Sequence, residues 1–531
     1  MSKVWGLLGL SLAAASLASV IAAVPVRAEQ AVPPAVDDLP DPPELVSRNG
    51  VLEATLTAAP SPLALGFWNF TSNVYNGLYV APTLRVRPGD ELRLTLLDRT
   101  GPADVQIGQA QQTNLHFHGL DTKPRVPGDD VFVRVGPGRG FRYTIDLPKD
   151  HPEGLNWYHP HVHGLIGGQI LSGMAGMLVV DGYIERHYPE LAGLRRRVMV
   201  LKGAYPPGWN PEAPPFRTVN GLLDPPIKAR PGEYQVWEVG NLNADSYVDL
   251  ALDGHELWTI ERDGNVQLRP FRQTSLLLTP GARATVVVRA GAPGSYALRS
   301  RAVDTGPGGD PNPEAVIGTL VVGGAPVEHA AIDARLKRPA AHPETISPRP
   351  DLVRALAITG RRTIELDESA DGTEFSINGR AYDENRTDVT VHVGDVEEWT
   401  IRNPTAERHV FHIHQTEFLV ETVDGVRPAF QGLVDTADVP YAQNGKPGEV
   451  KLLIPFTNPR IAGTFVFHCH LAEHEDGGMM ANIRVLPRRT LAADAWDGLR
   501  RLAGLEPTEG AGAGPDDLAG AICRSPAAAT E

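Results

Sequence analysis

Cysteine is nearly absent from this sequence. Of 531 residues only two are cysteine, Cys469 and Cys523. At most one disulfide bond is available, which excludes a disulfide scaffold, and a cysteine-rich zinc or iron–sulfur site is excluded for the same reason. Any thiolate chemistry therefore depends on these two positions.

Basic residues are also fewer than acidic ones. The chain has 49 lysines and arginines against 64 acidic residues, a formal net charge of −15. A general nucleic-acid binder needs a basic footprint on its surface, so we expect no nucleic-acid partner. The apolar share of 42% is enough to build a core, which excludes a wholly disordered chain.

Long apolar runs are missing after the N-terminus. The one run that approaches membrane-spanning length, residues 4–24, follows Lys3 and precedes a small-residue pattern at residues 26–28. This order predicts a cleaved signal peptide over residues 1–28, and an uncleaved membrane anchor is the alternative. We therefore expect an exported protein, periplasmic or extracellular, with no membrane segment after cleavage.

The C-terminal residues 504–531 are rich in glycine, alanine, proline and acid, with no periodic pattern. Such a composition predicts a disordered tail, in which Cys523 has no functional role. The 54 glycines and 47 prolines of the whole chain indicate frequent turns and a β-rich architecture.

One local pattern occurs three times. An Asn-Gly turn is followed by a Gly-acid turn and then by a strand with period-two alternation. The Asn-Gly turns are at residues 76–77, 220–221 and 378–379, and the strands are at 91–96, 234–239 and 397–401. The recurrence predicts an all-β protein of three β-sandwich domains, 45–183, 184–330 and 351–488; ordinary hairpins in one large β domain are the alternative.

Histidine is the unusual component, because 17 copies fall largely into four clusters. The clusters are His116 with His118; His159, His161 and His163; His409, His412 and His414; and His468 and His470 with His474 following. On a strand, alternate side chains share a face, so a His-x-His pair presents two imidazoles to one metal site.

In the third unit this alternation separates two sites. One strand face would collect four histidines, His412, His414, His468 and His470. The opposite face would collect His409 and Cys469. If the two strands lie side by side, one strand pair divides two different metal centres.

The composition of the Cys469 site is that of blue copper. His409, His474, Cys469 and Met479 supply two imidazoles, a thiolate and a weak axial thioether. Zinc fits less well, because structural zinc sites rarely recruit methionine. Chemistry alone does not separate Met479 from Met480, and a buried, inert thiol is the alternative for Cys469.

The other site would gather eight histidines from the first and third units. They are His116, His118, His159, His161, His412, His414, His468 and His470. Eight imidazoles fit about three ions with open positions for a small substrate. We expect this centre at the interface of the first and third domains.

On these four motifs the chain resembles a multicopper oxidase of the three-domain laccase type, over about residues 45–488. The resemblance implies cupredoxin-like Greek-key domains and four copper ions: one type 1, one type 2 and two type 3. It makes Cys469, His409, His474 and Met479 the type 1 ligands, and His116 and His412 the type 2 ligands. The type 3 ligands would be His118, His159 and His470 for one ion, and His161, His414 and His468 for the other.

Two residues near these motifs depart from the family pattern. Val410 stands where many members have proline, and Gln415 stands where many have glycine. The pattern also leaves out His163, for which we expect a structural or ligand-supporting role.

The resemblance implies an enzyme that uses O₂ and a small reducing substrate. Electrons would enter at type 1 copper and pass along the Cys469 backbone into His468 and His470, a short covalent route. Glu475 matches an acidic position that helps deliver protons, and Asp129 is a second candidate, although Asp130 fits as well.

The sequence does not identify the electron donor. A phenol-like donor is the leading hypothesis, and a metallo-oxidase of Cu(I) or Fe(II) in metal resistance is the alternative. Six methionines leave no Met-rich segment to collect Cu(I). A non-enzymatic copper protein would be expected to have lost ligands, and nitrite reduction needs fewer clustered histidines. The sequence does not indicate the oligomeric state.

Overall fold

The computed structural model describes residues 36–102, 112–210, 213–346, 348–369, 372–489 and 522–524. The predicted signal peptide, residues 1–28, lies outside these ranges, and so does most of the predicted tail, residues 504–531. Among the helices of the described ranges, none has the length and apolar character needed to cross a lipid bilayer.

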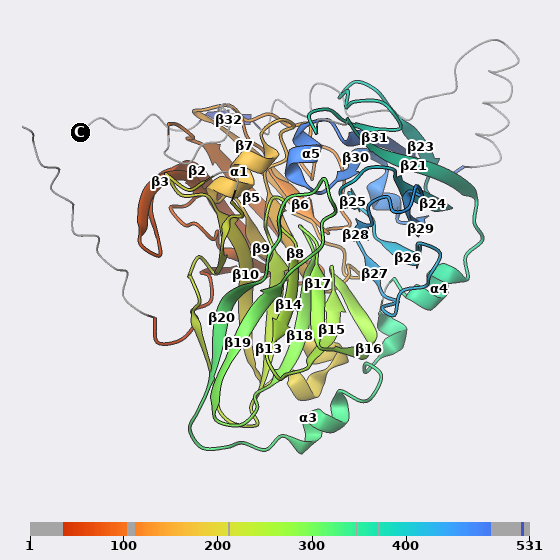
Figure 1. Ribbon diagram of the computed structural model, residues 1–531. Helices are drawn as coiled ribbons and strands as arrows, with labels where there is room; N and C mark the ends of the chain where they lie inside the picture. The colour runs from red at the N-terminus through yellow and green to blue at the C-terminus, as the bar shows by residue number, and fades with distance from the viewer. Residues whose placement is uncertain are drawn as a thin grey trace, which may run out of the picture.

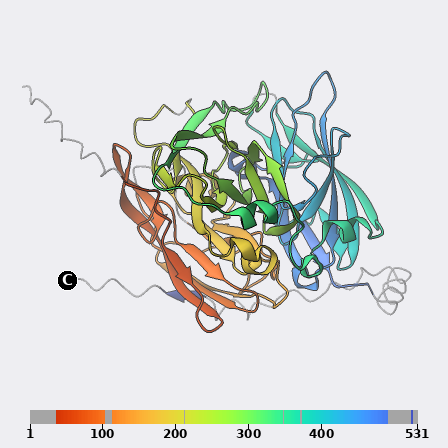
Figure 2. The same ribbon diagram turned by 90° about the horizontal axis from the view of Figure 1, so that it is seen from below.

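The predicted all-β fold is confirmed. Strands form six sheets, and the helices are short (Figure 1). Each pair of sheets comes from one stretch of chain, residues 44–180, 195–322 or 360–486, apart from one added strand. Viewed from below, the first stretch lies at the left and the third at the right (Figure 2).

The first unit contains two sheets, each described in strand order. One sheet is β1 (Glu44–Val46), β4 (Thr83–Val86), β9 (Gly176–Val180), β8 (Gly154–His159) and β6 (His116–His118). The other is β3 (Trp68–Tyr75), β2 (Val51–Leu65), β5 (Glu91–Asp98), β7 (Arg139–Asp146) and β32 (Ile522–Arg524). The pairing of β32 with β7 differs from the expected absence of regular structure at these three residues.

The middle unit repeats this plan. One sheet is β11 (Phe216–Val219), β10 (Arg195–Ala204), β13 (Tyr234–Asn241), β18 (Arg283–Arg289), β15 (Leu257–Arg262) and β16 (Asn265–Gln273). The other is β12 (Pro226–Ala229), β20 (Ala315–Val322), β19 (Gly294–Arg301), β14 (Val248–Leu252) and β17 (Ser275–Leu278).

The third unit has the same strand order. One sheet is β22 (Phe375–Ile377), β21 (Gly360–Glu368), β24 (Asp395–Asn403), β29 (Gly448–Phe456), β26 (Phe418–Val423) and β27 (Leu433–Val434). The other is β23 (Val389–His392), β31 (Met480–Leu486), β30 (Gly463–Cys469), β25 (His409–Ile413) and β28 (Thr436–Val439).

Short helices occupy the connections. They are α1 (Ile166–Ser172), α2 (Tyr183–His187), α3 (Ala330–Arg335), α4 (Pro350–Arg354) and α5 (Ala472–Asp476), with 3₁₀ turns at Pro189–Leu191, Pro343–Thr345 and Pro459–Ile461. Of these, α5 begins three residues after Cys469 and carries His474 and Glu475.

The three Asn-Gly turns are the physical basis of the repeat. At each, both residues have positive φ and the flanking residues pair across the turn, which is the type I′ hairpin geometry. Each asparagine side chain also accepts a backbone N–H from the neighbouring strand, at 2.8 Å for Asn76, 2.7 Å for Asn220 and 2.8 Å for Asn378. The same turn geometry therefore occurs once in each of the three sandwiches.

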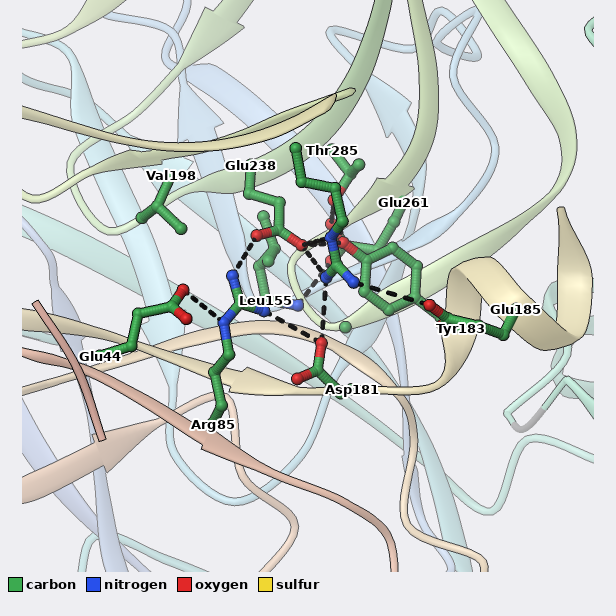
Figure 3. Close-up of polar contacts among 12 residues, drawn as sticks. Glu44, Arg85, Leu155, Asp181, Tyr183, Glu185, Val198, Glu238, Glu261 and Thr285 are labelled. Carbon is green, nitrogen blue, oxygen red and sulfur yellow. Dashed lines mark hydrogen bonds and ion pairs between the residues drawn. The ribbon is translucent and has the colours of Figure 1, made fainter. Parts of the chain in front are cut away.

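Each unit has its own core between its two sheets, and a further apolar cluster joins the first and middle units around Trp157, Tyr183 and Val200. A polar network crosses the same boundary (Figure 3). Arg85 donates to Glu238 at 2.8 Å and to Asp181 at 3.0 Å, so its buried charge is paired and hydrogen-bonded. This boundary is fixed by both kinds of contact.

Candidate metal centre

Two equivalent strand pairs carry the histidine motifs. In the first unit β6 runs antiparallel to β8, with His116 opposite His159. In the third unit β25 runs antiparallel to β30, with His412 opposite His468 and Phe411 opposite Cys469. The corresponding strands of the middle unit, β14 and β19, contain no histidine.

The register of β25 and β30 bears out the alternation predicted from the sequence. Directly opposite residues of an antiparallel pair point to the same face. His412 and His468 therefore share one face, while Cys469 points to the other with Phe411. The strand pair separates two groups of side chains, as expected.

The eight histidines of the first group come together between the first and third units. All are at most 2% exposed. The His116 ring stacks on His414 with centroids 3.8 Å apart, and His118 stacks on His412 at 3.9 Å. His161 Nε2 lies 3.4 Å from His468 Nε2, so ligand atoms of both units meet.

These imidazoles suit metal ions. Burial, with the neighbouring histidines, lowers the pKa of His116 and His159 well below the ordinary value. Burial also lowers the pKa of His161, to about 4, so the rings are neutral. Several buried ring nitrogens have no hydrogen-bond partner among the described residues, among them His116 Nε2, His159 Nε2 and His412 Nε2. Leaving such atoms unpaired is costly, and metal coordination removes the cost.

Potential ligand atoms converge in several sets of three. Within each set they lie no more than 4.8 Å apart. The histidine sets are His116, His118 and His159; His116, His412 and His414; and His161, His414 and His468. His116 and His414 each belong to two of these sets, so the sets adjoin one another.

The second group is compact and lies on the opposite face. Cys469 Sγ is 3.8 Å from His409 Nδ1 and 3.7 Å from His474 Nδ1, and the two nitrogens are 3.1 Å apart. Metal–nitrogen bonds of about 2.0 Å and a metal–sulfur bond of about 2.3 Å in a trigonal plane give separations near these values. The fully buried Cys469 thiol therefore lies beside two imidazole nitrogens, which an inert core thiol would lack.

Tertiary packing separates the two neighbouring methionines. Met479 is fully buried in the apolar cluster that contains Cys469 and Phe411, and its carbonyl accepts the Cys469 N–H at 3.0 Å. Met480 packs with Val131 and Val466 instead. Met479 is thus the methionine on the Cys469 side.

The two acidic residues expected to help deliver protons, Asp129 and Glu475, are buried and lie against the histidines. Asp129 Oδ2 lies 2.9 Å from His116 Nδ1, whereas Asp130 accepts the Phe132 N–H at 3.0 Å. Asp129 is therefore the member of the pair that lies against one of the eight histidines. Glu475 Oε1 lies 2.8 Å from His161 Nε2. Burial raises the pKa of both carboxyl groups, that of Asp129 to about 7.

Both departures from the family pattern contact the site. The Val410 N–H donates to Cys469 Sγ at 3.4 Å. Gln415 has a left-handed φ of 60°, and its side-chain amide donates to Asp129 Oδ2 at 2.7 Å. His163 lies beside the Tyr382 ring at 4.8 Å and is half-buried.

Sequence reasoning missed Asp435. Its carboxylate Oδ1 lies 3.3 Å from His118 Nε2, and its carbonyl accepts a hydrogen bond from His412 Nδ1 at 2.7 Å. The one available signal was a charged residue between the buried strands β27 and β28. Asp435 is buried, with 1% exposure.

Comparisons with known proteins give one consistent family. Models described as multicopper oxidase match residues 69–183, 198–325 and 356–489. A multicopper oxidase of Staphylococcus aureus is 26% identical over 454 residues, covering 82% of this chain and 89% of that protein. The cell division protein FtsP of Escherichia coli is 26% identical over 509 residues, covering 89% of this chain and 97% of that protein.

A solved structure has the same fold. It is the multicopper oxidase from Campylobacter jejuni, described as a metallo-oxidase, with a TM-score of 0.71 and 23% identity. The match covers 86% of this chain and 96% of that one.

Proposed function

The chain belongs to the multicopper oxidase family, and we propose that it couples one-electron oxidation of a small donor at a type 1 copper to four-electron reduction of O₂ at a three-copper cluster. The observation that carries this proposal is the convergence of two buried ligand groups on opposite faces of β25 and β30. Copper supplies one-electron redox steps at the first group and O₂ reduction at the second.

The ligands in this proposal are those implied by the sequence motifs. Cys469, His409, His474 and Met479 hold type 1 copper, and His116 and His412 hold type 2 copper. His118, His159 and His470 hold one type 3 ion, and His161, His414 and His468 hold the other. Cys469 lies between His468 and His470, so two peptide links of about 3.8 Å join the two centres.

Forming two waters from O₂ consumes four protons, and the described carboxyl groups that touch the ligands are the natural carriers. Glu475 reaches His161 and His468, at 2.8 Å and 3.3 Å. Asp129 reaches His116. We propose that Glu475 and Asp129 carry protons to the cluster.

Donor access is through a cavity of about 370 Å³ that adjoins His474. Its volume accommodates one aromatic ring, and the Phe375 ring stacks on His474 with centroids 4.4 Å apart. These features support a phenol-like donor that delivers one electron at the edge of His474 that lines the cavity. This is the first candidate substrate class.

A specific observation favours metal-ion oxidation as the second candidate. Five carboxylates line the cavity: Asp245, Asp310, Glu368, Glu407 and Glu473. Oxygen ligands suit hard cations, and no methionine or cysteine is among the described lining residues, so Fe(II) fits better than Cu(I). Metal oxidation is also the activity named for the Campylobacter jejuni relative.

A non-enzymatic role is the remaining alternative, since one relative is a cell division protein. The twelve predicted ligand residues are all present and buried, which supports copper binding in this chain. We also propose that the chain is exported after removal of residues 1–28. N-terminal sequencing of the mature protein tests the cleavage.

The decisive experiment measures copper content, the blue absorption band and O₂ uptake of the full-length mature protein. We expect four coppers per chain, and we expect Cys469→Ser to lose the blue band and the oxidase activity together. Retained activity without the blue band would refute the electron route. A wild-type protein that binds no copper would refute the oxidase proposal.

The same assay separates the donors. For Fe(II), Glu368→Gln and Asp310→Asn should raise KM several-fold while leaving a neutral phenol unaffected, because only the cation is attracted by the carboxylates. Glu365→Gln, which lies outside the cavity lining, is the matched control. Equal effects on both donors would contradict a cationic substrate.

A further inference from the structure

The middle unit carries none of the predicted copper ligands, yet one of its side chains binds Asp435, which lies against two of the histidines. Arg283 is the first residue of β18 and is fully buried. Its Nη1 and Nη2 donate to the two carboxylate oxygens of Asp435 at 2.7 Å and 2.9 Å. This is the bidentate fork geometry, the strongest form of an arginine–carboxylate contact.

Arg283 contacts all three units. Its Nε donates to the Leu155 carbonyl at 3.0 Å, on strand β8 of the first unit, four positions before His159. Its own backbone N–H donates to Asp263 in the middle unit at 2.7 Å. Since Asp435 belongs to the third unit, one guanidinium ties together the two ligand-bearing units and the unit that bears none.

Asp435 in turn faces two histidines with different atoms. Its carbonyl accepts from His412 Nδ1 at 2.7 Å, which leaves His412 Nε2 free of hydrogen bonds. Its carboxylate Oδ1 lies 3.3 Å from His118 Nε2 without a hydrogen bond, and this nitrogen has no hydrogen-bond partner among the described residues. His118 Nδ1 faces His470 Nε2 at 3.3 Å. When one ring nitrogen of a histidine forms a hydrogen bond, the other ring nitrogen is the one left to bind a metal.

We propose that Arg283 is a positioning residue for the three-copper cluster, because it fixes Asp435, whose carbonyl selects the ligating nitrogen of His412 and whose carboxylate lies against His118. The inference rests on the proposed function, since it presupposes copper at the cluster. In this proposal the middle unit positions residues of the cluster, in addition to separating the first and third units.

The test compares Arg283→Met with Arg197→Met. Arg197 is a matched control: it is also fully buried in the middle unit and pairs with a carboxylate, Asp38, but it contacts none of the ligand histidines. Both purified proteins are loaded with copper, and copper per chain, the blue band and the electron paramagnetic resonance spectrum are recorded.

Arg283→Met should keep the blue band and the type 1 signal. It should also change the hyperfine splitting of the type 2 signal or lose at least half of the cluster copper. Arg197→Met should leave these spectroscopic properties unchanged. Arg283→Lys, which keeps the charge but not the fork, should give an intermediate result.

If Arg283→Met does not fold, Asp435→Asn, which keeps the side-chain size, takes its place in the same measurements. A folded Arg283→Met with wild-type copper content and an unaltered type 2 signal would overturn the inference and leave the oxidase proposal intact. A wild-type protein without cluster copper would instead overturn the proposed function.

Discussion

The backbone N–H of Val410 donates to the sulfur of Cys469 over 3.4 Å. A hydrogen bond to the sulfur draws electron density from the thiolate and favours the reduced metal, so it raises the reduction potential of a blue copper site. Val410 is fully buried, which shields the contact from water.

Val410→Pro should therefore lower the type 1 reduction potential, because proline has no N–H to donate. A hydrogen bond of about 1 kcal/mol corresponds to roughly 40 mV for a one-electron couple. Redox titration of the blue band measures the shift, and Val410→Ile, which keeps the N–H, is the control. An unchanged potential in the proline variant would show that the contact does not tune the site.

Gly281→Ala should damage the cluster without removing the blue band. Gly281 has φ of 84°, and an added Cβ would lie 2.9 Å from His470 Nε2 and 3.2 Å from His118 Cε1. Gly254→Ala is the control, because Gly254 has φ of 71° but no atom within 4 Å of an added Cβ. Copper analysis should show a loss of cluster copper in the first variant and none in the second; equal occupancy would contradict the close packing.

Gln415→Gly tests two opposing contributions. Glycine relieves a left-handed φ that costs roughly 1–2 kcal/mol, but it loses the hydrogen bond to Asp129. We expect the free energy of unfolding to change by less than about 1 kcal/mol while O₂ turnover falls, because Asp129 is no longer held against His116. Calorimetry and O₂ uptake measure the two effects, and undiminished turnover would count against a role for this contact.

Lys202→Met should stabilise the protein, and more so at pH 6 than at pH 9. Burial lowers the pKa of Lys202 from 10.5 to about 7, and its Nζ has no hydrogen-bond partner among the described residues. Between these pH values the unfolded chain binds the extra proton, so stability rises with pH there, and the full penalty applies below pH 7.

The pKa shift sets an upper limit of about 5 kcal/mol, and the Tyr79 ring 4.9 Å from Nζ offsets part of it. Melting temperatures at the two pH values measure the effect. The exposed Lys446→Met is the control and should show no pH-dependent gain. A gain of equal size at pH 6 and pH 9 would contradict a buried lysine that loses its proton.

The local features of this protein were predictable because short spacings determine them. A two-residue spacing predicted that His412 and His414 lie together, and their ring centroids are 5.0 Å apart. The Asn-Gly pairs predicted the hairpins at residues 76, 220 and 378. The three-fold repeat and the two separate ligand groups follow from these patterns.

Choices between neighbouring residues were not predictable in this way. Asp129 and Asp130, or Met479 and Met480, have the same chemistry and differ only in the direction of the side chain. The packing of other strands decides that direction: Phe117 and Gln415 hold Asp129, and Val131 and Val466 contact Met480.

The sequence by itself determined the strand pattern, the three units and the types of candidate ligand, since each depends on residues a few positions apart. Only the tertiary structure decided the contact of Arg283 with Asp435, 152 positions away, and the gathering of five carboxylates beside His474. Such contacts leave no local periodicity in the chain. They form where the three sandwiches pack against one another. A charged side chain buried at such a boundary needs a partner, and the partner lies in a neighbouring sandwich.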